Sequence, residues 1–164
     1  MNLILPYIIP LLPIFTRGFL LIKFRSQMKE KLSDREKDKE THRIYIMSLA
    51  GFSFSALLAL VLLDAKFQKD LQLSIFYLFL SFLGYLFALN MQSYKEFWWQ
   101  DQLATAATEL GSLCLVLSII GILLTNNFNR SFALSLSGLA IIIWLADHLF
   151  RIYIVYKFRK KKRK

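Results

Sequence analysis

Four ionisable residues lie within apolar stretches of the chain and have the types needed for acid–base or ion chemistry: Glu109, Asp147, His148 and Arg151. Asp147 precedes Arg151 by four residues, which places both side chains on one face of a helix. An imidazole between a carboxylate and a guanidinium can change its charge near neutral pH. The group therefore suggests either an ion pair that fixes helix register or a proton-sensitive gate.

These residues must lie at membrane depth. If the last span ended at Ala146, the stretch 132–146 would be about 22 Å long, too short for a hydrocarbon core of about 30 Å. Glu109 lies about 9 Å inward from Leu103, and Arg151 lies about 9 Å inward from Lys157. The equal depths predict an ion pair between Glu109 and Arg151, with Asp147 as a second carboxylate and His148 beside it.

The composition of the chain places this group in a membrane protein. Of 164 residues, 56% are hydrophobic and 15% aromatic, more than a soluble domain of this length can bury. The chain has no HExxH or G-x-S-x-G motif and no phosphate-cradling glycine loop, and 105 residues separate its two histidines. We therefore expect no enzyme activity, no metal site and no cofactor. The net charge of +10 lies mostly beside the spans, which indicates topology rather than nucleic-acid binding.

The hydrophobic pattern predicts an all-α fold with a transmembrane bundle at 44–156. The four spans are 44–63, 71–91, 103–125 and 132–156, each long enough for a bilayer. Their short connections predict that consecutive helices are antiparallel neighbours.

The N-terminal segment 1–22 is apolar, but Pro6, Pro10 and Pro13 each remove a backbone donor, and Arg17 interrupts the run. Two interpretations stay open. The segment forms a kinked fifth span with Arg17 reaching toward the cytoplasm, or it is interfacial or re-entrant.

The charged segment 23–43 holds eight basic and five acidic residues. We expect it in the cytoplasm, as an ordinary loop or as a solvated helix that could contact a soluble partner. The spacing of Phe24, Met28 and Leu32 predicts that the preceding helix continues into it.

Basic residues predict the orientation. A cytoplasmic C-terminus in an inner membrane places sixteen Lys and Arg inside and three outside, as the positive-inside rule requires. Tyr94, Trp98 and Trp99 are then expected as an aromatic belt at the cytoplasmic interface. The basic tail 157–164 serves to keep the C-terminus inside, to bind anionic lipid head groups or to dock an acidic partner. Its basic residues are Lys157, Arg159, Lys160, Lys161, Lys162, Arg163 and Lys164.

Small residues recur at helical spacing in all four spans, which predicts close helix packing within this chain or against another subunit. The residues concerned are Gly51, Ser55, Ala59, Ser81, Gly84, Ala88, Ala107, Gly111, Ser135 and Gly138.

Two functions remain open. The first is a small integral subunit that anchors or assembles a membrane complex with other subunits or with itself, through its helices and its basic cytoplasmic segments. The second is a homo-oligomeric pore or membrane-permeabilising effector, gated from the cytoplasmic side by the Glu109 group.

Overall fold

A computed structural model describes residues 5–31, 40–63, 70–94, 96–125 and 129–162. Within these ranges the regular elements are helices, with one isolated β-bridge between Lys31 and Phe97. Five helices are long and apolar enough to cross a membrane. The expected all-α class of a multi-pass membrane protein is confirmed at that level.

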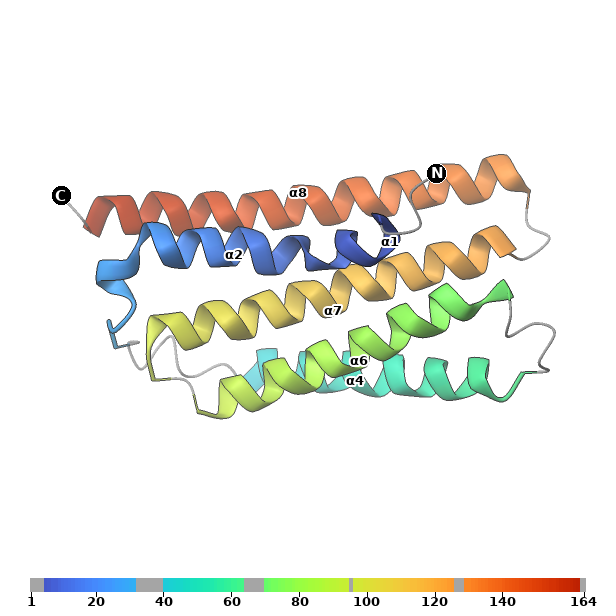
Figure 1. Ribbon diagram of the computed structural model, residues 1–164, viewed down its shortest axis with the longest axis horizontal. Helices are drawn as coiled ribbons and strands as arrows, with labels where there is room; N and C mark the ends of the chain where they lie inside the picture. The colour runs from blue at the N-terminus through green and yellow to red at the C-terminus, as the bar shows by residue number, and fades with distance from the viewer. Residues whose placement is uncertain (1–4, 32–39, 64–69, 95, 126–128, 163–164) are drawn as a thin grey trace.

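Long helices account for most of the described chain and lie side by side (Figure 1). The N-terminal part forms a short helix α1 (Leu5–Ile8), a 3₁₀ turn η1 (Ile9–Leu11), α2 (Leu12–Lys23) and a second 3₁₀ turn η2 (Arg25–Gln27). The four longer helices are α4 (Glu40–Val61), α6 (Gln72–Ser93), α7 (Trp98–Thr125) and α8 (Arg130–Lys162).

The proline-rich N-terminus forms a nearly continuous helical segment. Pro10 and Pro13 lie in the first turns of η1 and α2. A backbone N–H in the first turn of a helix has no acceptor within that helix, so a proline there removes no helical hydrogen bond. The segment Pro6–Lys23 thereby reaches the length of a span. Its main helix, α2, packs against α7 and α8 (Figure 1), so this part of the chain lies alongside the other long helices.

The predicted helix through Phe24 and Met28 is wrong in the described part of the charged segment. Helix α2 ends at Lys23, and Phe24 leaves the helical conformation with φ −109° and ψ 32°. Burial explains the break, since the Phe24 ring packs edge-to-face against Trp98 and Tyr156. The chain then folds back until the Trp98 N–H donates to the Glu30 carbonyl at 3.0 Å. Residues 32–39, which include Leu32 and six of the segment's thirteen charged residues, lie outside the described residues.

Helix α7 occupies the centre and packs most closely on α6. A Cβ at Gly84 would lie 3.0 Å from the Ala107 carbonyl oxygen and 3.2 Å from the Gly111 nitrogen. The backbones are therefore so close that a Cβ at this position would require α6 and α7 to shift apart by a few tenths of an ångström. The Ser81 hydroxyl donates to the Gly111 carbonyl at 2.8 Å and lies 3.1 Å from the Ser53 hydroxyl of α4.

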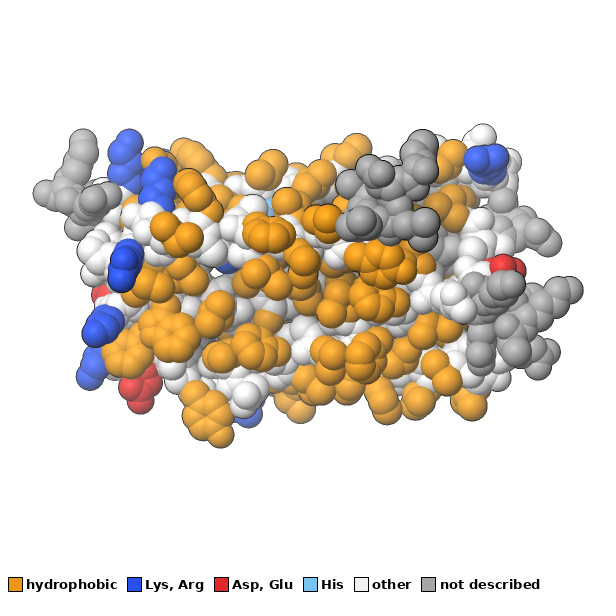
Figure 2. All heavy atoms as spheres, in the orientation of Figure 1, with side chains coloured by type: hydrophobic (Ala, Val, Ile, Leu, Met, Phe, Trp, Pro, Cys, Tyr) orange, Lys and Arg blue, Asp and Glu red, His pale blue; other side chains and the backbone are white. Residues whose placement is uncertain are grey.

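Helices α4 and α8 form the periphery. Helix α4 packs on α6 through buried residues that include Ile46, Ala50 and Ser53. Only 17% of the spanning stretch of α4 and of α8 is buried, against 39% for α6 and α7. Figure 2 shows apolar side chains over the middle of one face, with Lys and Arg gathered mainly at the end where the C-terminus lies. We call this end, formed by the ends of α2 and α8 and the start of α7, the basic end.

A buried ion-pair cluster and a polar groove

Glu109 of α7 lies at the centre of a buried polar cluster. The guanidinium of Arg17 on α2 binds the Glu109 carboxylate through two nitrogens. Nε donates to Oε2 at 3.1 Å, and Nη2 forms an ion pair with Oε1. The remaining terminal nitrogen of Arg17 donates to Gln102 Oε1 at 2.9 Å. The side chains of Arg17 and Glu109 are only 2% and 8% exposed, so this is a two-pronged ion pair shielded from its surroundings.

The register of α7 positions these partners. Gln102 and Glu109 are seven residues apart, which is about two helical turns, so both point to the same side of α7. Between them lies Ala106, which is also buried. A small side chain at that position lets α2 approach closely enough for the Arg17 guanidinium to reach both acceptors.

His148 brings α8 into the same cluster. Its side chain is 2% exposed, and Nδ1 lies 3.1 Å from Glu109 Oε2. Nε2 lies 3.1 Å from the Thr16 hydroxyl of α2. The imidazole stacks on Trp144, with 4.9 Å between ring centroids and 12° between planes, and the Trp144 indole donates to the Ser112 hydroxyl at 3.1 Å. The cluster thus joins α2, α7 and α8.

The predicted ion pair between Glu109 and Arg151 is wrong. Arg151 Nε donates to Asp147 Oδ2 at 2.7 Å within α8, and the two side chains are 51% and 57% exposed. Rotation of α8 explains the difference. His148 faces α7, and a helix turns about 100° per residue, so Asp147 and Arg151 lie to one side of that contact. Of the four predicted residues, the structure joins Glu109 to His148 and Asp147 to Arg151.

Arg17 is the partner that the sequence reasoning missed, although the sequence carried a signal for it. Arg17 lies six residues before Lys23, which is about 9 Å along a helix and equals the depth counted for Glu109. The same depth argument would have matched them if the N-terminal segment had been assigned to the bundle.

A groove of about 640 Å³ lies beside the cluster, between α4, α7 and α8. Most of its lining surface is apolar, and its polar side chains gather toward the basic end. The lining residues are His42, Tyr45, Leu49, Thr105, Thr108, Glu109, Ser112, Val116, Ala140, Ile143, Trp144, Asp147, His148 and Arg151. All four residues of the predicted group therefore border the groove, even though they form two separate pairs.

The small-residue stripes divide into two classes. Ser81, Gly84 and Ala88 of α6, with Ala107 and Gly111 of α7, are buried within the chain. The stripe on α4 is exposed along its length, at Gly51, Ser55 and Ala59. On α8, Ser135 is exposed and a Cβ at Gly138 would meet no atom within 4 Å.

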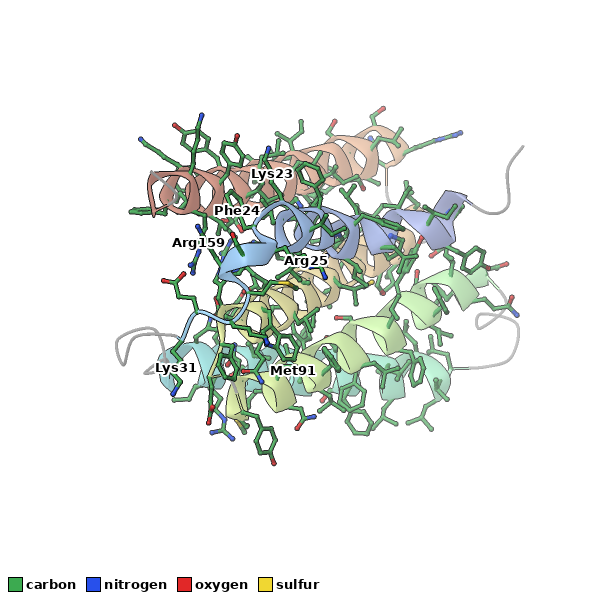
Figure 3. All side chains as sticks on the ribbon, turned by 60° about the vertical axis from the view of Figure 1, so that its left-hand side comes forward. Lys23, Phe24, Arg25, Lys31, Met91 and Arg159 are labelled. Carbon is green, nitrogen blue, oxygen red and sulfur yellow. The ribbon has the colours of Figure 1, made fainter. Side chains whose placement is uncertain are left out.

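The basic end holds a second ion pair. Arg159 of α8 is 8% exposed, pairs with Glu30 and lies 4.5 Å above the Trp98 ring. Figure 3 shows Arg159 beside the turn that follows Phe24. The prediction that Arg159 is available to lipid is therefore wrong. Lys157 and Lys160 are exposed, whereas the side chains of Lys161 and Lys162, and residues 163–164, lie outside the described part.

The predicted aromatic belt is only partly exposed. Tyr94 is 72% exposed, but Trp98 is 2% exposed and packs against Phe24. Trp99 is half-buried and packs against the same apolar cluster. Trp98 therefore fixes the chain reversal after α2 rather than facing lipid.

In the ranges that the structure describes, no three His, Cys, Asp or Glu residues are grouped as metal ligands. No family model, curated protein or solved structure matches this chain.

Proposed function

We propose that this chain is a small integral membrane subunit that assembles a membrane complex through the outward face of α4. The observation that carries the proposal is the exposed stripe of Gly51, Ser55 and Ala59. A Cβ at Gly51 would meet no atom within 4 Å. Small residues at this spacing let a second helix backbone approach closely, which is how helices gain contact inside lipid.

Within the described ranges, the other helices do not cover this stripe. Ile46, Ala50 and Ser53 hold α4 on α6 and are buried, and the 3.6-residue period places them on roughly the opposite side of α4 from Gly51 and Ser55. The corresponding small residues of α6 and α7 are already packed together. The α4 stripe is thus a packing surface that a helix from a second copy or from a different subunit would complete.

The buried cluster supports an anchoring role. Arg17, Glu109 and His148 tie α2, α7 and α8 together, and α7 in turn packs on α6. The α4–α6 pair is therefore held against α7, and the small-residue stripe of α4 faces away from the rest of the chain. This arrangement suits a subunit whose partner contact must keep one geometry.

Orientation is part of the proposal. Described basic residues cluster at the basic end, on α2, on the turns that follow it and on the last turns of α8. The positive-inside rule favours this end in the cytoplasm of a cell with an inner membrane. Exposed Lys157 and Lys160 would then lie where anionic head groups or a soluble acidic partner could reach them.

The pore alternative has less support. The carboxylate that would serve as its gate is held by Arg17 and His148 within one chain. The groove lies between α4, α7 and α8 and covers only part of the length of α7, so a conduit would need further polar surface from other copies. Ion flux through the reconstituted protein above that of empty vesicles would favour the pore. Flux equal to that of empty vesicles would exclude the pore function.

The test is the mass of the complex extracted from its native membrane in polymer-bounded lipid particles. We expect wild type to migrate as a larger assembly and Gly51→Leu to release the single chain. Gly18→Leu is the matched control, because a Cβ at Gly18 also meets no atom within 4 Å. Equal masses for wild type and Gly51→Leu would overturn the proposed interface.

A further inference from the structure

We propose that the groove between α4, α7 and α8 binds the head group of a zwitterionic phospholipid that carries a primary ammonium, of the phosphatidylethanolamine type. The groove volume of about 640 Å³ lies within the range of small-molecule sites. The proposal concerns the face of α4 that carries His42, Tyr45 and Leu49, which is not the Gly51 stripe. It therefore stands independently of the proposed assembly.

The groove is open along its side to the surroundings of the bundle. Helices α4 and α8 each pack on a neighbour but make little contact with one another. Tyr45 of α4 and Ile143 of α8 line opposite walls and are 55% and 60% exposed. A lipid in the adjacent leaflet can therefore enter sideways, without passing through the protein.

The lining matches the polarity profile of a lipid. His42 begins the groove near the start of α4, and Thr105 and Arg151 lie on α7 and α8 toward the basic end. Val116 and Ala140 line the end farther from it. The polar end suits a head group, and the apolar end suits the first part of an acyl chain.

Charge selects a zwitterion. Glu109 is balanced by Arg17 behind it, and Asp147 is balanced by Arg151. Apart from its histidines, the groove therefore carries no net charge with which to hold an anion. It does carry one exposed cation beside one exposed anion, which can bind phosphate and ammonium respectively.

The Asp147–Arg151 pair keeps ligand-binding capacity after its internal contact. That contact uses Nε of the guanidinium and Oδ2 of the carboxylate. Among the described residues, none hydrogen-bonds the terminal nitrogens of Arg151 or Oδ1 of Asp147. A phosphate can accept from the former, and an ammonium can donate to the latter.

The hydroxyl groups of α7 favour a ligand with N–H donors. Thr105, Thr108 and Ser112 donate their hydrogens to carbonyls of α7, at 2.8, 2.9 and 2.9 Å. Their oxygens can then only accept hydrogen bonds from a ligand. A primary ammonium supplies three donors, whereas the trimethylammonium of a choline head group supplies none. This difference assigns the ethanolamine head group.

The experiment reconstitutes the full chain in nanodiscs that contain equal amounts of phosphatidylethanolamine, phosphatidylcholine and phosphatidylglycerol with identical acyl chains. The lipid that stays bound through detergent washing is quantified by mass spectrometry. We expect about tenfold enrichment of phosphatidylethanolamine over phosphatidylcholine, the ratio that corresponds to a difference of about 1.4 kcal/mol. Asp147→Asn and Arg151→Gln should each abolish the enrichment.

Two controls separate the groove from other causes. Lys157→Gln removes an exposed cation that does not line the groove and should leave the enrichment unchanged. Far-UV circular dichroism should show unchanged helicity in the Asp147 and Arg151 variants, because both side chains are about half exposed. Retained lipid of bulk composition, enrichment of phosphatidylglycerol, or enrichment that survives both groove variants would each overturn the proposal.

Discussion

Replacing Arg17 with methionine should destabilise the fold far more than the same change at an exposed arginine. In the structure the Arg17 guanidinium makes two contacts with Glu109 and one with Gln102, and both members of the ion pair are buried. Its removal leaves a buried carboxylate whose remaining side-chain contact in the cluster is His148. Breaking a buried pair by removing one partner typically costs about 3–5 kcal/mol, and we expect Arg17→Met to lose about 3 kcal/mol of unfolding free energy.

The double variant Arg17→Met with Glu109→Met distinguishes a buried charge from lost packing. With both charges removed, no uncompensated ion remains, and replacement of a buried pair by apolar residues is often neutral or stabilising. We therefore expect the double variant to recover about 2 kcal/mol or more relative to Arg17→Met.

The assay is SDS-induced unfolding in mixed micelles, followed by far-UV circular dichroism. Arg151→Met is the matched control, because Arg151 forms an exposed ion pair with Asp147, one turn away on α8. Such pairs contribute only about 0.5 kcal/mol. If a single variant cannot be purified, the yield of folded double variant gives the same comparison. A loss at Arg17 no larger than that at Arg151, or no recovery in the double variant, would refute the assignment of a clamp.

Two further predictions test the helix contacts. Gly84→Leu should cost about 1–3 kcal/mol of stability in the same assay, because the leucine side chain would meet backbone atoms of α7. Gly18→Leu is the control and should change stability little. Equal effects of the two substitutions would contradict the close approach of α6 and α7. Arg159→Gln should speed tryptic cleavage after Lys29 about tenfold, as expected if the turn after α2 loses about 1.4 kcal/mol of local stability. Cleavage at the wild-type rate would show that the Glu30 pair does not hold that turn.

Periodicity and length predicted the spans because each is a long apolar run, and lipid requires backbone hydrogen bonds to close within a helix. The predicted spans 103–125 and 132–156 lie inside α7 and α8, whereas 44–63 and 71–91 extend beyond one end of α4 and α6 by two residues and one residue. The N-terminal segment was harder to assign, since prolines normally disrupt helices. Whether Pro10 and Pro13 break a helix or begin one depends on where the turns fall, and hydropathy does not record this.

The sequence pointed to Glu109 and His148 of the cluster, but it did not predict their pairing and it missed Arg17. Depth along a helix follows from counting, so Glu109 and His148 were correctly expected at a similar level. Rotation about the helix axis depends on packing against neighbours, which no single-helix pattern specifies. That missing angle explains why Arg151 was assigned to Glu109 in place of Arg17. It also explains why the stripes that face inward on α6 could not be told from the outward stripe on α4.

The most direct test of the proposed assembly is disulfide cross-linking through Ser55→Cys in intact native membranes. The chain's own Cys114 is fully buried and stays in place. Ile142→Cys is the control, because Ile142 is 64% exposed on α8 and lies away from the stripe. We predict a cross-linked band for Ser55→Cys, either a dimer of this chain or an adduct with another subunit, at a yield well above that of Ile142→Cys. Equal yields at the two positions would contradict the claim that the outward face of α4 is an interface.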